Sequence, residues 1–293
     1  MRNKKTILIT GGKGFLGKRL IPVLVKKGYK VKSFDIVDGQ DITKPQQIEG
    51  AIKNCDIVMH LAAVADLNYA REHPKETMDV NILGTINVLE GCRKYKKDLI
   101  FTSTCCVYGN PDTHPVDENT FPKPTEIYAH SKLAGEHLIL GYAKHFGIKY
   151  NILRLATFYG PEMRPALAPY VFLSRVMKGE PIEIHGKGKQ TRTFTYVDDI
   201  VDGIVAVLKS GVWNEIINIT TEEETSVLRL AELAMKIVGK KVPLKFVADR
   251  PGQIKKEQIL ARKAKKLLGW EAKVSMEEGL KLTYEWMKTL KKL

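Results

Sequence analysis

The chain has 293 residues and a mass of 33.0 kDa, which is enough for one large domain with a smaller companion. Hydrophobic residues make up 44% and charged residues 27% of the sequence, a globular composition that excludes a disordered or low-complexity chain. No apolar run approaches the roughly 18 residues needed to cross a bilayer, and the start MRNKKTILIT runs directly into a strand-like pattern. We therefore expect a protein that is neither inserted in a membrane nor exported.

The net charge of +14 is compatible with a polyanionic partner, with small anionic ligands or with a lysine-rich surface. Short lysine clusters are scattered along the chain without interleaved aromatic residues, which favours a solvated surface and makes a nucleic-acid partner unexpected. The four cysteines include the adjacent pair Cys105 and Cys106, and no Cys or His spacing is typical of a zinc site. These features predict no metal and fit a reducing cytoplasm.

The first half of the chain alternates short β-rich apolar runs with longer amphipathic stretches. This rhythm, with strands that are apolar on both faces, predicts an α/β fold with a doubly wound parallel sheet of the Rossmann type. The expected strands are 5–10, 30–34, 57–61, 99–102 and 150–155, and the expected helices are 15–27, 43–53, 74–95 and 127–146.

The rhythm changes after about Ala156, where a proline-interrupted segment over 160–181 begins. The rest of the chain predicts helices over 197–209, 226–238, 261–268 and 275–290, and strands over 215–220 and 242–247. The strand over 215–220 can return to the main sheet. We expect a Rossmann domain of residues 1–156 plus about 187–220, and a smaller discontinuous substrate domain of residues 157–186 plus 221–293.

A glycine-rich turn follows the first expected strand and opens the first expected helix. Gly11, Gly14 and Gly17 allow backbone N–H groups and the helix N-terminus to approach a pyrophosphate closely. Asp35 lies 18 residues after Gly17 at the end of the second strand, where its carboxylate can accept both ribose hydroxyls of an adenosine. Because this carboxylate would repel a 2′-phosphate, the pattern predicts NAD rather than NADP.

Tyr128 and Lys132 are four residues apart on an expected helix and therefore share one face. An adjacent ammonium favours the phenolate and lowers the pKa of a tyrosine, so the pair is a candidate general acid and base. Ser103 and Thr104 follow the strand over 99–102, which places hydroxyls at the carboxyl edge of the sheet, where open α/β sheets bind ligands. A hydroxyl there can donate to a substrate oxygen as charge develops.

Together, these motifs resemble the extended short-chain dehydrogenase/reductase family, the NAD-dependent nucleotide-sugar epimerases and dehydratases, over nearly the whole chain. Asp41 is similar to the family's adenine-contacting Asp, the segment 60–63 to its H-x-A-A strand end, and Asn81 to its structural asparagine. The resemblance implies that Thr104, Tyr128 and Lys132 are catalytic. The residues it implies for NAD are Gly11, Gly14, Phe15, Leu16, Gly17, Asp35, Asp41, Ile42, Leu61, Ala62, Ala63 and Lys132.

The second half carries further family motifs at 154–161, 186–199 and 250–253. The resemblance implies that Arg192 and Arg250 hold the nucleotide diphosphate, which suits the geometry of guanidinium groups. It also implies that Thr104, Tyr128 and Thr157 contact the substrate, although Thr157 stands where the family usually has an asparagine.

Cys105 and Cys106 stand where the 4,6-dehydratases have Asp-Glu, and the decarboxylating members keep the Glu. Those reactions need a carboxyl group to move a proton, so its absence argues against both. We expect the two cysteines to be space-filling, but in the C3/C5-epimerases of the family a cysteine at the position of Cys106 acts as acid or base. His60 and His130 are expected to be structural.

The resemblance is greatest to members that act as UDP-glucose 4-epimerases. It predicts a UDP-sugar 4-epimerase of the glucose/galactose type that acts through a transient 4-ketone and regenerates NAD. A nucleotide-sugar C3/C5-epimerase or 4-keto reductase that uses Cys106 is the alternative among enzymes, and an inactive NAD-sensing binding or regulatory protein is the alternative outside them. We also expect a cytoplasmic homodimer. The nucleotide base and the sugar are left open by the sequence.

Overall fold

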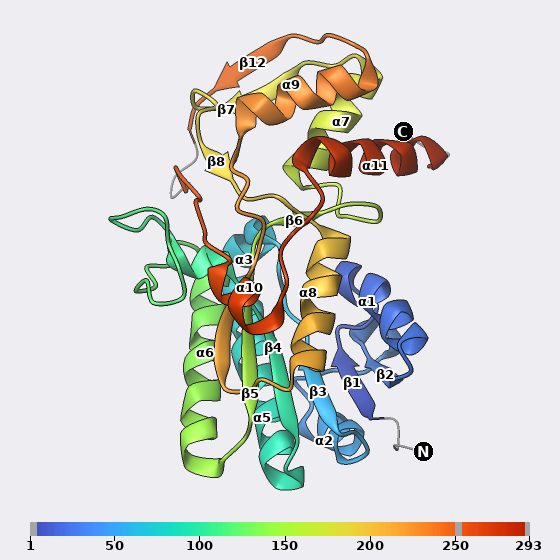
Figure 1. Ribbon diagram of the computed structural model, residues 1–293, viewed down its shortest axis with the longest axis vertical. Coiled ribbons are helices and arrows are strands. Elements are labelled where there is room, and N and C mark those ends of the chain that lie inside the picture. Colours follow the sequence, from blue (N-terminus) through green and yellow to red (C-terminus); the bar gives the residue numbers. More distant parts are fainter. Residues whose placement is uncertain (1–4, 250–253, 291–293) are drawn as a thin grey trace.

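The computed structural model describes residues 5–249 and 254–290. Figure 1 shows a parallel sheet with helices on both faces in its lower half, and a separate group of helices and short strands above it. The lower group has a buried hydrophobic cluster on each face of its sheet, and the upper group has a cluster of its own.

The central sheet has six strands, all parallel, in the order β10-β5-β4-β3-β1-β2. The strands are β1 (Thr6–Thr10), β2 (Lys30–Phe34), β3 (Ile57–His60), β4 (Asp98–Thr104), β5 (Tyr150–Leu155) and β10 (Glu215–Ile219). Because β2 lies on one side of β1 and β3 on the other, the strand order reverses at β1. Open α/β sheets bind their ligands at the carboxyl ends of the strands beside such a reversal.

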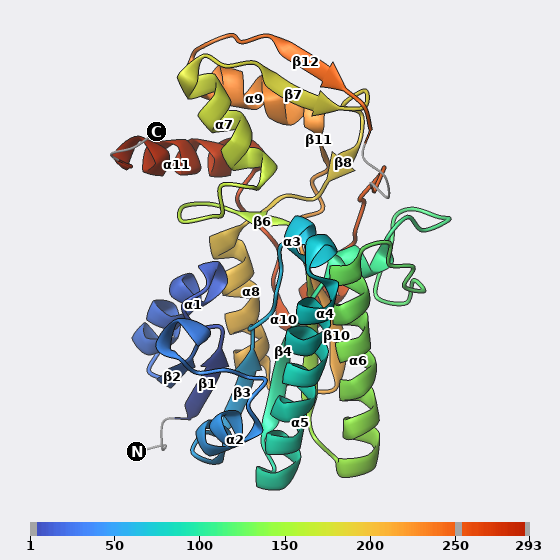
Figure 2. The same ribbon diagram turned by 180° about the vertical axis from the view of Figure 1, so that it is seen from behind.

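Alternate residues of the strands face opposite helical layers, as the period of two requires. Ile7 and Ile9 of β1 belong to the cluster beneath α1 and α8, whereas Leu8 belongs to the cluster on the other face. One layer contains α1 (Phe15–Lys26), α8 (Val197–Ser210) and α10 (Arg262–Leu268), and the other contains α2 (Pro45–Lys53), α5 (Gly84–Tyr95) and α6 (Ile127–Phe146), which Figure 2 shows from behind. The predicted doubly wound sheet is confirmed.

The upper group packs three helices against short strand pairs around residues such as Leu173, Leu230 and Leu280. Its helices are α7 (Ala168–Lys178), α9 (Val227–Val238) and α11 (Met276–Thr289). Its strand pairs are β7 (Ile182–His185) with β12 (Leu244–Val247) and β8 (Thr191–Arg192) with β11 (Thr225–Ser226), and below them β6 (Phe158–Tyr159) pairs with β9 (Thr195–Tyr196).

Several elements differ from the sequence-based expectations. The helix expected over 74–95 is divided into α4 (Pro74–Met78), a π-helical turn η2 (Asp79–Leu83) and α5, because the side chain of Asn81 is bound by the neighbouring loop. The proline-interrupted segment contains α7, which tolerates its proline in the first turn, where no N–H partner is lost. The short α3 (Leu67–Glu72) and the strand β7 were not expected.

Candidate active site

The glycine turn joins β1 to α1 and approaches the loop after β3. Gly11 has a φ of +72°, and a Cβ there would lie 2.8 Å from the backbone of Ala62, so only glycine fits. A Cβ on Gly17 would lie 2.5 Å from the carbonyl oxygen of Gly12, which lets α1 pack directly on the turn. The helix begins after Gly14 without a side-chain cap and without an acidic residue in its first turn. Its first N–H groups and its positive dipole end therefore suit an anion such as a pyrophosphate.

Asp35 ends β2 and is buried beside this turn. Its Oδ2 accepts from the backbone N–H of Lys13 at 2.8 Å, and its Oδ1 accepts from that of Val37 at 3.0 Å. Each carboxylate oxygen has a further lone pair, so the side chain can shape the turn and still accept ribose hydroxyls.

The remaining residues expected to bind NAD surround the same turn. The N–H of Ala62 donates to Thr10 Oγ1 at 3.3 Å, which fixes the loop of Leu61, Ala62 and Ala63 against the end of β1. Asp41 accepts from Thr43 at 2.8 Å through both its N–H and its hydroxyl, and Ile42 packs against Gly84. A glycine cradle, an uncapped helix start and a strand-end aspartate are a donor and acceptor set that fits a dinucleotide.

The side chains of Phe15 and Leu16 are engaged elsewhere. Leu16 is buried in the cluster beneath α1 and α8, and the ring of Phe15 stacks on Phe158 with 5.4 Å between ring centres. Both residues can therefore serve an anion through their backbone at the helix start, while their side chains hold α1 in place.

Thr104, Tyr128 and Lys132 meet at the carboxyl end of β4. Thr104 is the last residue of β4, and its hydroxyl is hydrogen-bonded to the phenol of Tyr128 in the first turn of α6. Thr104 Oγ1 also accepts from the N–H of Cys106 at 3.2 Å. Lys132 lies one turn further along α6, is 2% exposed and places Nζ 4.0 Å from the centre of the Phe101 ring.

Burial dominates the electrostatics of the pair on α6. It raises the pKa of Tyr128 above its ordinary value, and the charge of Arg164 and the hydrogen bond from Thr104 only partly oppose this. It lowers the pKa of Lys132 to about 7, against the opposing charge of Glu136. The prediction that Lys132 lowers the pKa of Tyr128 is therefore wrong for these side chains by themselves. Burial disfavours the charged form of both groups and has the largest effect on the pKa of each.

A buried polar network lies behind these residues. Glu136 of α6 accepts from the hydroxyl of Ser103 and from Arg154, whose Nη2 lies 2.7 Å and Nε 3.1 Å away. Arg154 Nη1 donates to the Tyr108 hydroxyl at 3.0 Å, and this hydroxyl donates to Asn218 Oδ1 at 2.7 Å. The network ties α6 to β4, β5, β10 and the turn η3 (Cys105–Tyr108). Sequence reasoning missed it, because polar residues within apolar strands do not reveal their partners.

Asn81 connects the π-helical turn to α6. Its Oδ1 accepts from the N–H of Val64 at 2.8 Å, and its Nδ2 donates to the carbonyl of Val64 at 3.0 Å and to Ser131 Oγ at 2.8 Å. The Ser131 hydroxyl in turn donates to the carbonyl of Tyr128 at 2.7 Å. Asn81 thereby holds the first turn of α6 against the loop that follows β3.

The two histidines lie in different surroundings. His60 is buried, with Nδ1 2.7 Å from Thr10 Oγ1 and Nε2 3.1 Å from Thr85 Oγ1. Burial, together with the charge of Lys132, lowers the pKa of His60 to about 3, so the ring is neutral at physiological pH. His130 is exposed on α6.

Both cysteines next to Thr104 are thiols at neutral pH. Burial and the charge of Glu257 raise the pKa of Cys106 to about 11, against a hydrogen bond from Thr104 and the charge of Arg192. Cys105 is buried and donates to the carbonyl of Arg154 at 3.3 Å, and its pKa is also raised by burial.

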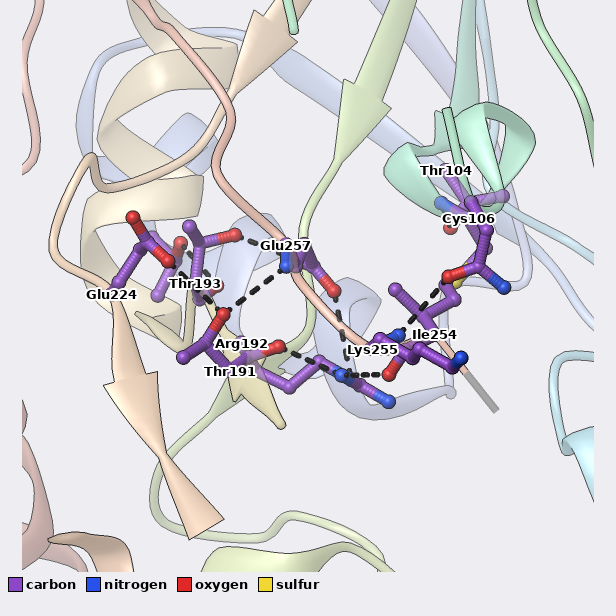
Figure 3. Close-up of polar contacts among 11 residues, drawn as sticks. Thr104, Cys106, Thr191, Arg192, Thr193, Glu224, Ile254, Lys255 and Glu257 are labelled. Carbon is purple, nitrogen blue, oxygen red and sulfur yellow. Dashed lines mark hydrogen bonds and ion pairs between the residues drawn. The ribbon is translucent and has the colours of Figure 1, made fainter. Parts of the chain in front are cut away.

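Arg192 lies on β8 and faces the segment that precedes α10 (Figure 3). Its Nη1 donates to the carbonyls of Thr191 at 2.7 Å and Ile254 at 2.8 Å, and its Nε lies 3.7 Å from Glu257 Oε2. These contacts hold the guanidinium on one side and, among residues 5–249 and 254–290, leave Nη2 without a hydrogen-bond partner. Its expected partner Arg250 lies outside the described residues.

Thr157 directly precedes β6 and is half-buried, and its carbonyl accepts from the N–H of Thr195 at 2.9 Å. It is therefore part of the connection from the sheet to the upper group of elements.

Glu257 is a buried site residue that sequence reasoning missed. Its Oε1 accepts from the Thr193 hydroxyl at 2.7 Å, and its N–H donates to Thr191 Oγ1 at 3.2 Å. Burial raises the pKa of Glu257, and the hydrogen bonds from Thr193 and the charge of Arg192 oppose this by favouring the ionised form. Because the surrounding sequence Ile-Lys-Lys-Glu is typical of a solvated surface, the pattern gave no sign of a buried carboxylate.

Neither a metal centre nor a membrane span is found in the part of the chain that the structure describes. No three His, Cys, Asp or Glu side chains there are grouped as metal ligands, and no helix there is long and apolar enough to cross a bilayer.

Comparisons with known proteins agree with this geometry. Residues 7–220 match the model of the NAD dependent epimerase/dehydratase family. A putative UDP-glucose 4-epimerase of Methanocaldococcus jannaschii is 34% identical, over 96% of this chain and 98% of that protein. The structure of a UDP-glucose 4-epimerase of Thermotoga maritima with UDP-glucose has a TM-score of 0.92 at 32% identity, covering 97% of this chain and 98% of that one. A UDP-glucuronic acid 4-epimerase of Bacillus cereus, in complex with UDP-glucuronic acid and NAD, has a TM-score of 0.91 at 33% identity, with coverages of 97% and 99%.

Proposed function

The chain belongs to the NAD-dependent epimerase/dehydratase family, and from this membership we propose that it is a UDP-sugar 4-epimerase of the glucose/galactose type. The observation that carries the proposal is the hydrogen-bonded pair of Thr104 and Tyr128, with Lys132 one turn away, at the carboxyl edge of the sheet. This arrangement suits the removal of a proton from a sugar hydroxyl next to a dinucleotide site.

When bound, NAD would supply the hydride acceptor and donor that epimerisation at C4 through a transient ketone requires. We assign its pyrophosphate to Gly11, Gly14 and the N–H groups from Phe15 to Gly17, and its adenosine to Asp35, Asp41 and Ile42. Leu61, Ala62 and Ala63 would border it, and Lys132 would hold the nicotinamide ribose.

Tyr128 accepts the proton of the C4 hydroxyl, and Thr104 donates a hydrogen bond to the same oxygen. Lys132, with a pKa of about 7, is an ammonium in part of the molecules at neutral pH, and in this form it favours the phenolate of Tyr128. Burial opposes the phenolate, so the cationic neighbours of Tyr128 decide whether it can act as the base.

We assign the diphosphate to Arg192 and Arg250, and a contact with the sugar to Thr157. In the described parts of the chain the Nη2 of Arg192 has no hydrogen-bond partner, which supports this role, because a guanidinium held through its other nitrogens presents a fixed donor to an anion. We propose the same division as from the sequence, with residues 1–156 and about 187–220 for NAD and residues 157–186 and 221–293 for the nucleotide sugar. Of the latter, α10 packs against α8 and β10 of the first domain.

The raised pKa of Cys106 argues against the alternative enzymes. Burial raises the pKa of both Cys106 and Tyr128, but the largest charge acting on Cys106, that of Glu257, also raises its pKa, which is about 11, whereas the positive charge of Arg164 favours the phenolate of Tyr128. The presence of Thr104, Tyr128 and Lys132 in one cluster argues against an inactive binding protein. We also propose a cytoplasmic homodimer, which is supported by free cysteines at all four positions and by the family resemblance.

Incubation with UDP-glucose in deuterated water tests this function. A 4-epimerase returns the hydride that it removed, so NMR should show UDP-galactose without carbon-bound deuterium. The Cys106→Ser variant should remain active, because its thiol takes no part. Deuterium at C3 or C5 that disappears in Cys106→Ser would favour the C3/C5-epimerase instead, and no turnover of any nucleotide sugar would favour a binding protein.

A further inference from the structure

Glu136 lies on the same face of α6 as two of the proposed catalytic residues. It follows Lys132 by four residues, as Lys132 follows Tyr128, and residues at this spacing are neighbours on a helix. Lys132 is 2% and Glu136 is 1% exposed, so water screens the interaction between their charges only weakly. A buried carboxylate therefore lies one helical turn beyond the proposed catalytic lysine.

The carboxylate of Glu136 is fixed by the sheet. Its Oε1 accepts from the hydroxyl of Ser103, the residue of β4 that directly precedes Thr104. Arg154 of β5 donates to both carboxylate oxygens, with 2.7 Å between Nη2 and Oε2 and 3.1 Å between Nε and Oε1. Charge-assisted bonds of this kind favour the ionised form of a buried carboxylate. Glu136 therefore presents a negative charge at a fixed place behind the site.

Lys132 has no closer negative charge. In the described parts of the chain no carboxylate forms a direct ion pair with it, and its Nζ lies over the ring of Phe101. Burial lowers the pKa of Lys132 to about 7, and the charge of Glu136 is what opposes this. His60 of β3, whose pKa is lowered by burial and by the charge of Lys132, is neutral and adds no charge.

The other ionisable groups on the elements packed against α6 do not replace Glu136. Those of α3, α4, α5 and η2 are exposed or bound to one another, as Arg71 is with Glu126, Tyr69 with Glu76, Lys75 with Asp79, Glu90 with Arg93, and Lys94 and Tyr95 with Glu49, while Glu72 is exposed. Asp98 and Tyr150 begin β4 and β5, at the far ends of these strands from Ser103 and Arg154. Burial raises the pKa of Cys92, Cys105, Cys106 and Tyr108, which are therefore neutral.

We propose that Glu136 is a positioning residue, whose buried charge keeps Lys132 in the ammonium form that favours the phenolate of Tyr128. This inference rests on the proposed 4-epimerase function, which gives the phenolate its role. In that reaction Tyr128 takes a proton from the C4 hydroxyl and returns it to the same oxygen, so no net proton leaves the site. Lys132 therefore has to keep its charge rather than pass a proton on, and Glu136 acts through Lys132 without touching the sugar.

The direct test is an NMR titration of the ligand-free protein with lysine labelled at ¹³Cε. The Lys132 signal is the one that is absent from Lys132→Met, and we expect it to titrate near pH 7, apart from ordinary lysines near 10.4. In Glu136→Gln the midpoint should fall by about one pH unit, because the opposite charge is removed and that of Arg154 is no longer balanced.

Two variants separate the charge of Glu136 from its packing. Glu136→Gln keeps the size of the side chain and loses its charge, whereas Glu136→Asp keeps the charge and shortens the side chain. We expect Glu136→Asp to retain most of the normal midpoint. Tyr108→Phe is the matched control, because it removes the bonds to Arg154 and Asn218 at the other end of the network without removing a charge. Its Lys132 midpoint should not change.

The same variants are compared by epimerisation of UDP-glucose with NAD from pH 6 to 9. Activity should fall on the alkaline side as Lys132 loses its proton, and in Glu136→Gln this fall should begin about one pH unit lower. At a pH above both midpoints kcat should therefore be about tenfold lower than in the unmodified protein, with a KM changed less than about threefold. Glu136→Asp should recover most of kcat.

An unchanged Lys132 midpoint in Glu136→Gln would overturn the inference, as would an equal shift in Tyr108→Phe or a larger shift in Glu136→Asp than in Glu136→Gln. If Glu136→Gln does not fold, the double variant Arg154→Met with Glu136→Met removes the same negative charge without leaving a cation unpaired, and it should show a lower midpoint as well. The NMR titration needs no substrate. Absence of turnover of all nucleotide sugars would thus overturn the proposed function, whereas the midpoints decide whether Glu136 holds the charge of Lys132.

Discussion

At the scale of single residues, the site combines two groups whose charged forms are both disfavoured by burial. Tyr128 must lose a proton to act as a base, and Lys132 must keep one to help it. The pKa of Lys132 falls to about 7 and that of Tyr128 rises, so the side chains alone leave both groups neutral at slightly alkaline pH. The catalytic state of Tyr128 therefore depends on the positive charge that surrounds it when ligands are bound.

The lowered pKa of Lys132 predicts a specific pH dependence of stability. Unfolded lysine titrates near 10.4, so between pH 7 and pH 10 the unfolded chain binds more protons at this position than the folded one. The free energy of unfolding should therefore rise with pH in this range relative to Lys132→Met, by at most about 1.4 kcal/mol per pH unit.

Urea unfolding of both proteins without ligands at pH 7, 8 and 9 measures this difference. Comparison with Lys132→Met cancels the contribution of the cysteines and tyrosines to the pH dependence, because these groups titrate in both proteins. A difference that does not change with pH would show that Lys132 keeps its ordinary pKa in the fold.

At the scale of elements, helices and strands with a clear hydrophobic period in the sequence were predictable. Elements whose geometry depends on contacts with distant residues were not. The strands β2 and β5 and the helix α6 have the predicted bounds, because their apolar patterns and the glycine after α6 mark them in the sequence. The π-helical turn at Asp79–Leu83 was missed, because its cause is the hydrogen bonds of Asn81 to a loop 17 residues earlier.

The same limit applies to the candidate site. Residues in local motifs, such as Gly11, Tyr128 and Lys132, were named from the sequence, and the structure places them at the expected edge of the sheet. Glu257 and Glu136 were not named. Their roles come from partners such as Thr193 and Arg154, which lie 64 and 18 residues away in the chain.

The network of Glu136 predicts how strongly α6 is fixed to the sheet. Both partners of the Arg154–Glu136 pair are buried, with side-chain exposures of 4% and 1%. Arg154→Met leaves an unpaired buried carboxylate and should lower the free energy of unfolding by about 3–5 kcal/mol. The double variant Arg154→Met with Glu136→Met should lose less than the single variant, because it removes both charges together.

A double-mutant cycle from urea unfolding measures this coupling. The exposed pair of Lys75 and Asp79 is the control, and its removal should leave stability within experimental error. Equal losses in the single and double Arg154 variants would mean that packing, and not the unpaired charge, sets the cost.

At the scale of the whole molecule, the two groups of elements meet at the carboxyl edge of the sheet. Phe15 of α1 stacks on Phe158, and Arg19 of α1 binds Asp198 of α8 with 2.6 Å between Nη2 and Oδ1. The start of α1, which is assigned to the pyrophosphate, is thus held by residues on both sides of this junction. A ligand at the glycine turn should therefore stabilise the fold beyond the turn itself.

NAD binding should accordingly be visible as a rise in the melting temperature of the whole protein. At a concentration of 100 times its dissociation constant, a ligand that binds only the folded state adds about 2.7 kcal/mol to the free energy of unfolding. Because we propose that Asp35 selects NAD, NADP at the same concentration should produce a smaller rise in the melting temperature. Asp35→Ala should weaken the binding of NAD and reduce the difference between the rises in melting temperature that NAD and NADP produce. The substitution removes both the acceptor for the ribose hydroxyls and the charge that repels a 2′-phosphate.

Asp38→Ala is the matched control for this prediction. Asp38 is an exposed aspartate three residues further on, and it pairs with the side chain of Lys13 rather than with the backbone of the turn. Its removal changes the net charge equally but leaves the strand-end acceptor in place. If Asp38→Ala reduces the difference between NAD and NADP as much as Asp35→Ala does, the preference for NAD comes from the overall negative electrostatic field at this edge of the sheet. If only Asp35→Ala reduces this difference, the ribose hydroxyls are recognised by the Asp35 carboxylate oxygens, which also accept from the N–H groups of Lys13 and Val37.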